Sequence, residues 1–314
     1  MAENTVKKIA TRESYGNSLK ELAEEFPNLV VLDADLAAAT KTGIFRKAYP
    51  DRHIDCGIAE ENMMGVAAGL SLVGKIPFVS SFAMFAAGRA FEQVRNSIGY
   101  PHLNVKIGAT HAGITVGEDG ATRQCNEDIA LMRTIPGMVV MCPSDDVEAR
   151  AAVRAALEYE GPVYIRFGRA AVPVINDHPG YHFEIGKGTV VREGKDVTIV
   201  ATGICVDSAL GAAKMLEEEG ISAEVVNICT IKPLDEEIIL NSAKKTGKVV
   251  TVEEHSVIGG LGSAVCDCLC AHYPVPVKKV GMQDVFGESG SAAALVEKYG
   301  LDAKGVYKSV KEFL

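Results

Sequence analysis

The sequence contains no apolar run long enough to cross a membrane. Its longest, residues 63–74, includes three glycines and falls short of the roughly 20 residues that a spanning helix needs. The first twenty residues lack the apolar core of a signal peptide. Positive charge is not in excess, since the net charge is −9 and the pI is near 5.4. We therefore expect a cytoplasmic protein that is not a general binder of nucleic acid or membrane surfaces.

Cysteine pairs with the C-x-x-C spacing of zinc sites are also missing. Cys266, Cys268 and Cys270 form a C-x-C-x-C cluster, but on a helix Cys268 points away from the other two. We interpret them as small residues of a helix rather than as a metal site. The 8 cysteines are dispersed in a large chain without secretory features, so we expect them to be reduced.

The 314 residues, 47% of them hydrophobic and 23% charged, suffice for two folded domains. Strand and helix patterns alternate, which predicts an α/β fold with mainly parallel sheets covered on both faces. Residues 173–195 have no sustained period and predict a linker between a first domain, 1–172, and a smaller second domain, 196–314. Strands are predicted within residues 29–35, 53–57, 77–80, 105–113, 138–144, 162–168, 196–203, 223–229, 248–255 and 274–281. Helices are predicted within residues 12–26, 60–71, 127–133, 145–159, 206–219, 235–245 and 259–273.

Residues 54–70, IDCGIAEENMMGVAAGL, combine the end of a strand, a glycine and a helical run. Glu60 and Glu61 have a simple interpretation, because acids in a helix's first turn meet free N–H groups and the positive end of the dipole. A functional interpretation is favoured because this acid pair follows a buried strand and precedes a nearly uncharged helix. A carboxylate partly removed from water is suited to proton transfer.

Two aromatic residues follow the strand predicted at 77–80. Phe82 and Phe85, in SFAMFAAG, lie one helical turn apart, a spacing usual for core residues. Their neighbours are mostly small, which leaves room for a flat ligand.

Polar residues crowd the segment 109–128, ATHAGITVGEDGATRQCNED, whose glycines mark a loop. A lone histidine after a strand is usually structural, yet His111, Asp119 and Arg123 share this loop with a further acid. Such density indicates a binding site for a polar ligand. Asp35, Glu60, His111 and Arg169 all come at or just after predicted strand ends, where sites in parallel sheets gather.

These motifs resemble thiamine-diphosphate enzymes of the transketolase family. The first domain carries GIAE, SFAMFAAG and THAGITVGEDGATRQ, and is similar to the family's pyrimidine-binding domain. The second carries VATG, CTIKPLD and TVEEHSVIGGLGSAV, and resembles the C-terminal domain of transketolases. The likeness extends from about residue 10 to residue 306. It implies a thiamine-diphosphate-binding fold followed by that C-terminal α/β domain. The glycine-rich run 259–262 could cradle a phosphate, but we interpret it as a site of tight helix packing.

The resemblance assigns cofactor contacts. It implies that Glu60 hydrogen-bonds a ring nitrogen of the aminopyrimidine and favours the tautomer that removes the thiazolium proton. It implies that Phe82 and Phe85 hold this ring, and that Asp35 lies near the cofactor. A third aromatic common in transketolases falls on Gly88, so stacking should be less enclosed here.

The resemblance also assigns substrate contacts. His111 should lie near the donor hydroxyls and the reacting carbon, and Asp119 on the hydroxyl next to the carbonyl. Arg12 and Arg169 match positions that bind the sugar phosphate, a task that suits the planar guanidinium. Arg123 stands where relatives commonly have His, so sugar preference should differ. Without the resemblance, Arg12 and Arg169 would be interpreted as surface residues in ordinary salt bridges.

One family motif is missing. Transketolases bind Mg²⁺ and the diphosphate through G-D-G followed by Asn, and no G-D-G occurs in this sequence. We therefore expect an N-terminal partner subunit that supplies the Mg²⁺ ligands, with two copies of each subunit in a heterotetramer. Gly65, Gly69 and an apolar strip through Met63 and Met64 are candidates for the partner interface.

The sequence thus predicts the C-terminal subunit of a split transketolase, which transfers a two-carbon ketol unit from a ketose phosphate to an aldose phosphate. One alternative is a subunit of another thiamine-diphosphate carboligase, such as a deoxyxylulose-phosphate synthase-like enzyme, in which Arg typically replaces His111. A second is a non-catalytic regulatory subunit of the same fold. Joint retention of Glu60, both phenylalanines, His111 and Asp119 argues against that second alternative.

Overall fold

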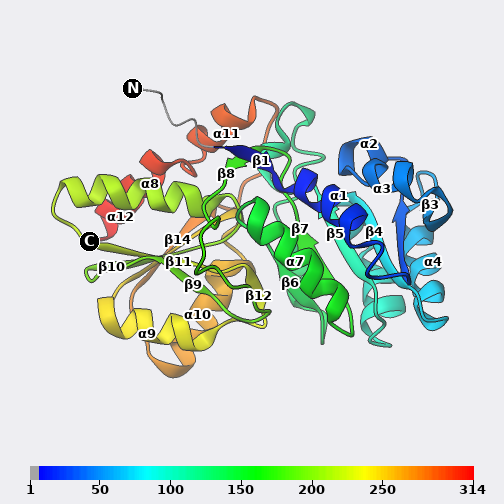
Figure 1. The fold of residues 1–314 in the computed structure, drawn as a ribbon. Coiled ribbons are helices and arrows are strands. Elements are labelled where there is room, and N and C mark those ends of the chain that lie inside the picture. Colours follow the sequence, from blue (N-terminus) through cyan, green and yellow to red (C-terminus); the bar gives the residue numbers. More distant parts are fainter. Residues whose placement is uncertain (1–6) are drawn as a thin grey trace.

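Two mainly parallel β-sheets, one for each half of the chain, organise the fold (Figure 1). The structure is a computed structural model that describes residues 7–314, so residues 1–6 of the predicted first domain lie outside the described residues. The first sheet has seven strands in the order β12-β6-β7-β5-β4-β2-β3, and neighbours pair in parallel except β12 with β6. Its strands are β2 (Leu29–Asp33), β3 (His53–Asp55), β4 (Ile76–Phe82), β5 (Lys106–Thr110), β6 (Val139–Met141), β7 (Val163–Arg166) and β12 (Thr230–Lys232).

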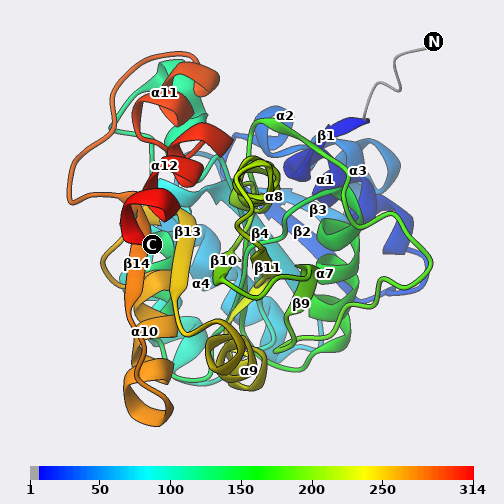
Figure 2. The same cartoon turned by 90° about the vertical axis from the view of Figure 1, so that its left-hand side faces the viewer.

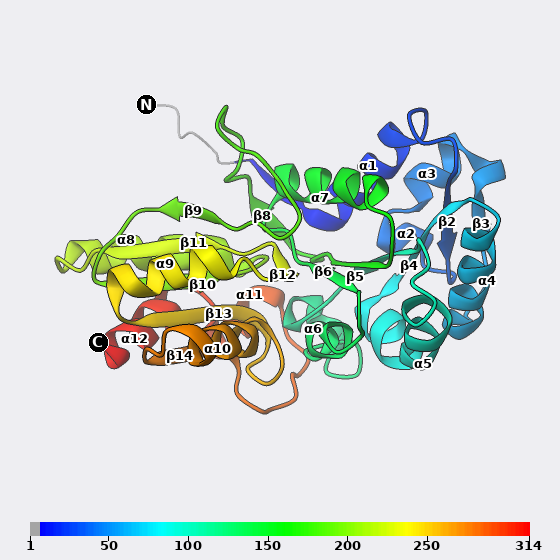
Figure 3. The ribbon, with the colours of Figure 1, turned by 90° about the horizontal axis from the view of Figure 1, so that it is seen from below.

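Helices cover both faces of this sheet (Figure 3). Successive side chains of a strand point to opposite faces, so Val31 packs with Tyr15 and Phe45 of one layer while Leu32 enters the core of the other. The first layer contains α1 (Thr11–Leu22), α3 (Gly43–Ala48) and α7 (Asp146–Glu158). The second contains α4 (Glu60–Leu72), α5 (Phe91–Gln93), α6 (Asp128–Arg133) and the π-helices η2 (Met84–Arg89) and η3 (Val94–Gly99). Short helices α2 (Ala37–Thr40), η1 (Pro50–Arg52) and η4 (Ile114–Asp119) lie in loops.

The second sheet has five strands in the order β14-β13-β10-β11-β9, parallel except for β9 at the edge. Helices α8 and α12 cover one face, and α9 and α10 cover the other (Figures 1 and 2). The elements are β9 (Thr189–Arg192), β10 (Val197–Ala201), β11 (Ala223–Asn227), β13 (Val249–Ser256), β14 (Val277–Met282), α8 (Cys205–Glu218), α9 (Glu236–Thr246), α10 (Leu261–His272), α11 (Ala292–Lys298) and α12 (Ala303–Phe313). An antiparallel pair, β1 (Lys8–Ala10) and β8 (Ala171–Pro173), lies apart from both sheets.

Each strand and helix range predicted from the sequence overlaps an element of that type. Four strands were not predicted: β1 and β8, which pair with each other, and the strands β9 and β12. Strand β9 lies inside the predicted linker and pairs with β11. Strand β12 comes from the second half of the chain but pairs antiparallel with β6, so it extends the first sheet. Both are short, and each pairs with a strand distant in sequence, which periodicity alone does not reveal.

The apolar residues of α4 correct one prediction. Met63 and Met64 are fully buried in the core between α4 and the first sheet, so the idea that they form a partner interface is wrong. Gly65 and Gly69 are exposed, and a Cβ added at either would meet no atom within 4 Å. The open surface of this region therefore lies on the glycine face of α4.

The cysteine cluster lies on α10, with Cys268 buried, Cys266 half-buried and Cys270 exposed. Within residues 7–314, His, Cys, Asp and Glu side chains nowhere gather in threes in a way that could hold a metal ion. Among the same residues, no helix is both long and apolar enough to cross a membrane.

Candidate active site

The predicted site residues gather at one edge of the first sheet. Strands β2, β4, β5 and β7 run parallel, so their carboxyl ends meet there. Phe82 ends β4, His111 follows β5, and Arg169 comes shortly after β7. The backbone of His111 is left-handed, with φ 55°, which is uncommon for a residue with a side chain. Such conformations concentrate at functional sites.

Glu60 and the two phenylalanines form a connected surface. Glu60 begins α4, is 2% exposed, and its Oε2 accepts a hydrogen bond from Nη1 of Arg89 at 2.9 Å. The guanidinium of Arg89 also lies 4.6 Å from the centre of the Phe85 ring. The ring of Phe85 stacks on that of Phe82, with centroids 5.9 Å apart. The structure therefore links a buried carboxylate to two stacked aromatic rings through the guanidinium of Arg89.

Arg89 was not singled out from the sequence. It ends the π-helix η2, directly after the SFAMFAAG motif, and its side chain is 45% exposed. An arginine that follows an aromatic motif carries no distinctive spacing, so only the fold reveals its contact with Glu60.

His111 joins the aromatic surface to a cationic one. Its ring stacks on Phe82 at a centroid distance of 3.9 Å, and its Nε2 lies 3.2 Å from Nη1 of Arg12. Because a guanidinium can only donate, Nε2 accepts and the proton resides on Nδ1, 2.9 Å from the Thr110 hydroxyl. Burial, together with the charges of Arg12, Arg169 and Lys41, lowers the pKa of His111 to about 3. The ring is therefore neutral at physiological pH.

Three cations surround this histidine. Nη1 of Arg12 also donates to the carbonyl oxygen of Ala39 at 2.9 Å. Burial and the charge of Arg169 lower the pKa of Arg12. Lys41, which the sequence analysis did not identify, has a left-handed backbone with φ 71° and a salt bridge to Glu13 at 3.2 Å. The positive charges of Arg12, Arg169 and Lys41 outnumber the carboxylates beside them. This part of the site therefore favours an anionic ligand.

The loop after β2 is shaped by Asp33, a third residue that was not singled out from the sequence. Its buried carboxylate accepts hydrogen bonds from the Leu36 amide and from the hydroxyls of Thr40 and Thr42. Burial raises the pKa of Asp33, and these hydrogen bonds oppose that rise. The turn they build places Lys41 near His111.

The other predicted residues lie further out. Asp35 is exposed, with φ 59°, and its amide donates to Oδ1 of Asp55. Asp119 and Arg123 are exposed on the loop after β5. Arg169 is half-buried, and its Nη1 donates to the Val116 carbonyl and lies 3.2 Å from a carboxylate oxygen of Glu118.

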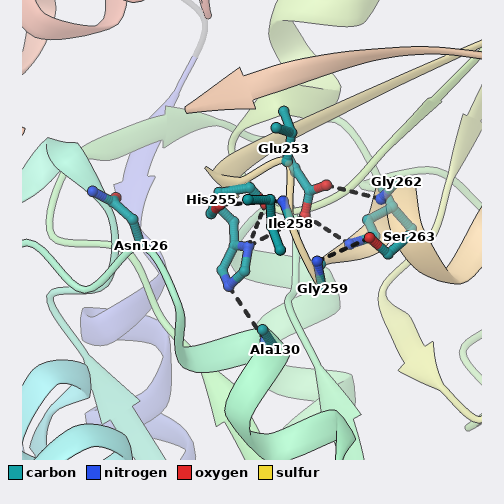
Figure 4. A network of polar contacts seen from close by, with 12 residues as sticks. Asn126, Ala130, Glu253, His255, Ile258, Gly259, Gly262 and Ser263 are labelled. Carbon is teal, nitrogen blue, oxygen red and sulfur yellow. Dashed lines mark hydrogen bonds and ion pairs between the residues drawn. The ribbon is translucent and has the colours of Figure 1, made fainter. Parts of the chain in front are cut away.

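The glycine-rich run of the second domain holds an internal carboxylate (Figure 4). Glu253 is buried on β13, and its oxygens accept hydrogen bonds from the amides of Leu261 and Gly262 at 2.7 and 2.8 Å. A Cβ added at Gly260 would lie 2.0 Å from the Glu253 carboxylate. Tight packing thus accounts for this run, because the amides that could bind a phosphate are already used.

Two family models match the chain. One, described as the transketolase pyrimidine-binding domain, matches residues 7–174, and the other, the transketolase C-terminal domain, matches residues 186–306. This chain belongs to the transketolase family. The resemblance and the α/β fold class predicted from the sequence are confirmed.

The similar proteins include subunits of split transketolases. A putative transketolase C-terminal section from Methanocaldococcus jannaschii is 51% identical over 96% of this chain and 95% of its own length. A 6-deoxy-6-sulfo-D-fructose transketolase subunit from Clostridium sp. is 49% identical over 96% of this chain and 93% of its own length. A solved split-gene transketolase, described as an inactive β4 tetramer, is 58% identical, covers 98% of both chains and superposes with a TM-score of 0.89. The chain is thus similar, over nearly its whole length, to C-terminal subunits of split transketolases.

Proposed function

We propose that this subunit, together with an N-terminal partner, transfers a two-carbon ketol unit from a ketose phosphate to an aldose phosphate. One observation carries the proposal: Arg89 links Glu60 to Phe85, and successive contacts continue from Phe85 through Phe82 and His111 to Arg12, so that these residues form a single surface. That surface offers an acid and aromatic faces for a cofactor ring at one end and cations for an anionic substrate at the other.

The residues fit the pyrimidine half of thiamine diphosphate. When bound, the cofactor supplies the carbon that takes up the ketol unit and stores its negative charge. Glu60 would hold the pyrimidine ring and exchange a proton with it, while Phe82 and Phe85 offer flat apolar faces. Asp35 would lie close to the cofactor. In the free chain Nη1 of Arg89 donates a hydrogen bond to Oε2 of Glu60. The pyrimidine ring must therefore share this oxygen with Arg89 or displace Arg89 from it.

The substrate side follows from charge. Arg12 and Arg169 would bind the sugar phosphate, with Arg123 and Asp119 on its hydroxyl groups. Neutral His111 would accept a hydrogen bond at Nε2 near the reacting carbon without adding charge, because its pKa is lowered to about 3. The similar Clostridium protein acts on a sulfonated fructose, according to its name, so the anionic group in this family is not always a phosphate.

A second polypeptide would complete the site. The described residues offer no cluster that could hold Mg²⁺, and the sequence has no G-D-G. The partner would therefore supply the diphosphate-binding domain and the metal ligands. Ile58, Leu72 and Val73 are exposed apolar side chains close in sequence to the open glycine face of α4, and we propose this surface as part of the interface. We expect two copies of each subunit.

The test is a reconstitution. The chain is purified alone and with a candidate partner that carries G-D-G, and ketol transfer is measured with thiamine diphosphate and Mg²⁺. We expect activity only in the mixture. Full activity of the chain alone would refute the split-enzyme proposal, and no activity with a partner encoded beside it would favour the non-catalytic alternative.

A further inference from the structure

The loop that carries the substrate residues is held mainly by the second domain. This loop, residues 111–126, begins at His111 and includes Asp119 and Arg123. Its ends are brought together within the first domain, where the Gly113 amide donates to the carbonyl of Cys125 at 2.8 Å. Beyond this point Arg169 of the first domain donates to the Val116 carbonyl, and further contacts come from β13 and the loop before α11.

Glu254 makes the most buried of these contacts. It lies on β13, and its Oε1 accepts a hydrogen bond from the Thr115 amide at 2.7 Å. A Cβ added at Gly113, whose φ is 73°, would lie 2.4 Å from the Glu254 carboxyl carbon. Only glycine therefore allows this carboxylate to approach the loop so closely.

Arg166 connects the same carboxylate to the other end of the loop. Its Nη2 donates to the carbonyl oxygens of Glu254 and Cys125, at 2.7 and 3.4 Å, and its Nη1 lies 3.8 Å from Glu254 Oε2. Its Nε pairs with Asp128 at 2.9 Å. All these groups are buried, so the network is rigid and removal of one charge leaves the others poorly compensated.

Further bonds follow along the loop. The Ser256 amide donates to the Asn126 carbonyl at 2.7 Å. Just after the loop, on α6, the Ala130 amide donates to Nε2 of His255 at 3.3 Å (Figure 4). The side-chain amide of Gln124 donates to the Glu288 carbonyl at 2.8 Å. Helix α11 packs against η4, which forms the tip of the loop.

We propose that Glu254 is a positioning residue for ketol transfer: it fixes the substrate loop through Thr115 and Arg166 and so links the second domain to sugar binding. The proposal rests on the proposed function in one respect, the assignment of this loop to the substrate. Glu254 touches neither cofactor nor reacting atoms. Its effect reaches the substrate through the placement of His111 and Asp119.

Glu253 provides a matched control. It is the preceding residue of the same strand and is equally buried, but its carboxylate binds amides of α10 within the second domain. Loss of either carboxylate should destabilise the fold. Only loss of the Glu254 carboxylate should loosen the loop 111–126.

The first experiment uses the full chain without a partner. Hydrogen–deuterium exchange is followed by mass spectrometry in peptides covering residues 111–119 and 259–265. We expect Glu254→Ala to accelerate exchange in the first peptide by roughly tenfold to a hundredfold, because the Thr115 amide loses a charged acceptor. Glu253→Ala should accelerate exchange in the second peptide alone. An unchanged first peptide in Glu254→Ala would overturn the proposal.

The second experiment uses the assembled enzyme. Glu254→Ala should raise KM for the sugar phosphate and lower kcat while leaving cofactor affinity unchanged, and Glu253→Ala should leave both kinetic constants near the native values. Equal changes of KM and kcat in Glu254→Ala and Glu253→Ala would show that Glu254 only stabilises the fold, and would overturn the proposal.

A conservative variant guards against misfolding. Glu254→Gln keeps an oxygen for the Thr115 amide, so exchange and KM should lie between those of the native chain and Glu254→Ala. If the alanine variants do not fold, the comparison of Glu254→Gln with Glu253→Gln decides by the same criteria. If the native enzyme shows no ketol transfer, the proposed function fails while the exchange measurements still decide the role of Glu254.

Discussion

Replacement of Glu60 by glutamine tests the proposed cofactor contact most directly. Glutamine has nearly the same shape, so the fold of α4 should be preserved, but it cannot exchange a proton with the pyrimidine ring. Proton transfer by a positioned side chain contributes roughly 100- to 10,000-fold to rate, or about 3–5 kcal/mol of barrier. We therefore expect turnover to fall by at least about two orders of magnitude.

The structural cost should be small by comparison. Glu60 is 2% exposed, but its partner Arg89 is 45% exposed and remains solvated when the carboxylate is removed. Glutamine keeps a side-chain oxygen that can accept the hydrogen bond from Arg89, so the substitution should cost about 1 kcal/mol. The melting temperature of the isolated chain should therefore drop by no more than about 3 °C.

The assay combines both measurements. Ketol transfer is measured in the assembled enzyme and thermal unfolding in the isolated subunit, with Glu61→Gln as the control. Glu61 is the next residue of the same helix and is half-buried, so its substitution should leave turnover near the native value. If Glu60→Gln keeps near-native turnover, the assignment of the acid to the cofactor is wrong.

Three other predictions follow from the same surface. Arg12→Ala and Arg169→Ala should reduce kcat/KM for a sugar phosphate about tenfold or more relative to the unphosphorylated sugar, and equal losses on both substrates would make these arginines structural. Because the pKa of His111 is lowered to about 3, its imidazole binds a proton below about pH 6.5 in the unfolded chain but not in the folded chain. The free energy of unfolding measured with urea should therefore be about 2 kcal/mol lower at pH 5 than at neutral pH because of this residue. The His111→Asn variant should lack this contribution. Leu72→Lys, at an exposed position, should weaken assembly with the partner in sedimentation experiments while leaving thermal unfolding of the free chain unchanged, and unaltered assembly would place the interface elsewhere.

Local pattern predicted most of the fold because buried parallel strands are short apolar runs and the helices between them keep a 3.6-residue period. The same logic predicted where the candidate site residues lie, since polar residues after strand ends meet at one edge of a parallel sheet. Glu60, Phe82, Phe85 and His111 were brought into one connected surface by topology alone. Strand β12 and the partners of the linker strand β9 could not be predicted, because their pairing depends on contacts between distant segments.

One physical reason explains why several site residues were not predicted from the sequence. Arg89, Lys41 and Asp33 act through what they touch, and nothing in their own sequence neighbourhood distinguishes them from surface or turn residues. Glu254 is an extreme case, since it follows another equally buried glutamate and only the direction of its carboxylate separates the two roles. Conversely, Met63 and Met64 looked suited to an interface, but their helix face packs on the sheet.

The pairing of β12 with β6 bears on how this chain can be dissected. A strand from the second half completes the edge of the first sheet, so the halves are not exchangeable modules. A fragment that ends at the linker would leave the backbone N–H and C=O groups of β6 open along an edge of a hydrophobic sheet, a common starting point for aggregation. Expression of the first half alone should therefore give insoluble material unless residues 230–232 or a substitute strand accompany it. For the same reason, recombination between related subunits should succeed only when the crossover keeps β6 and β12 from one parent.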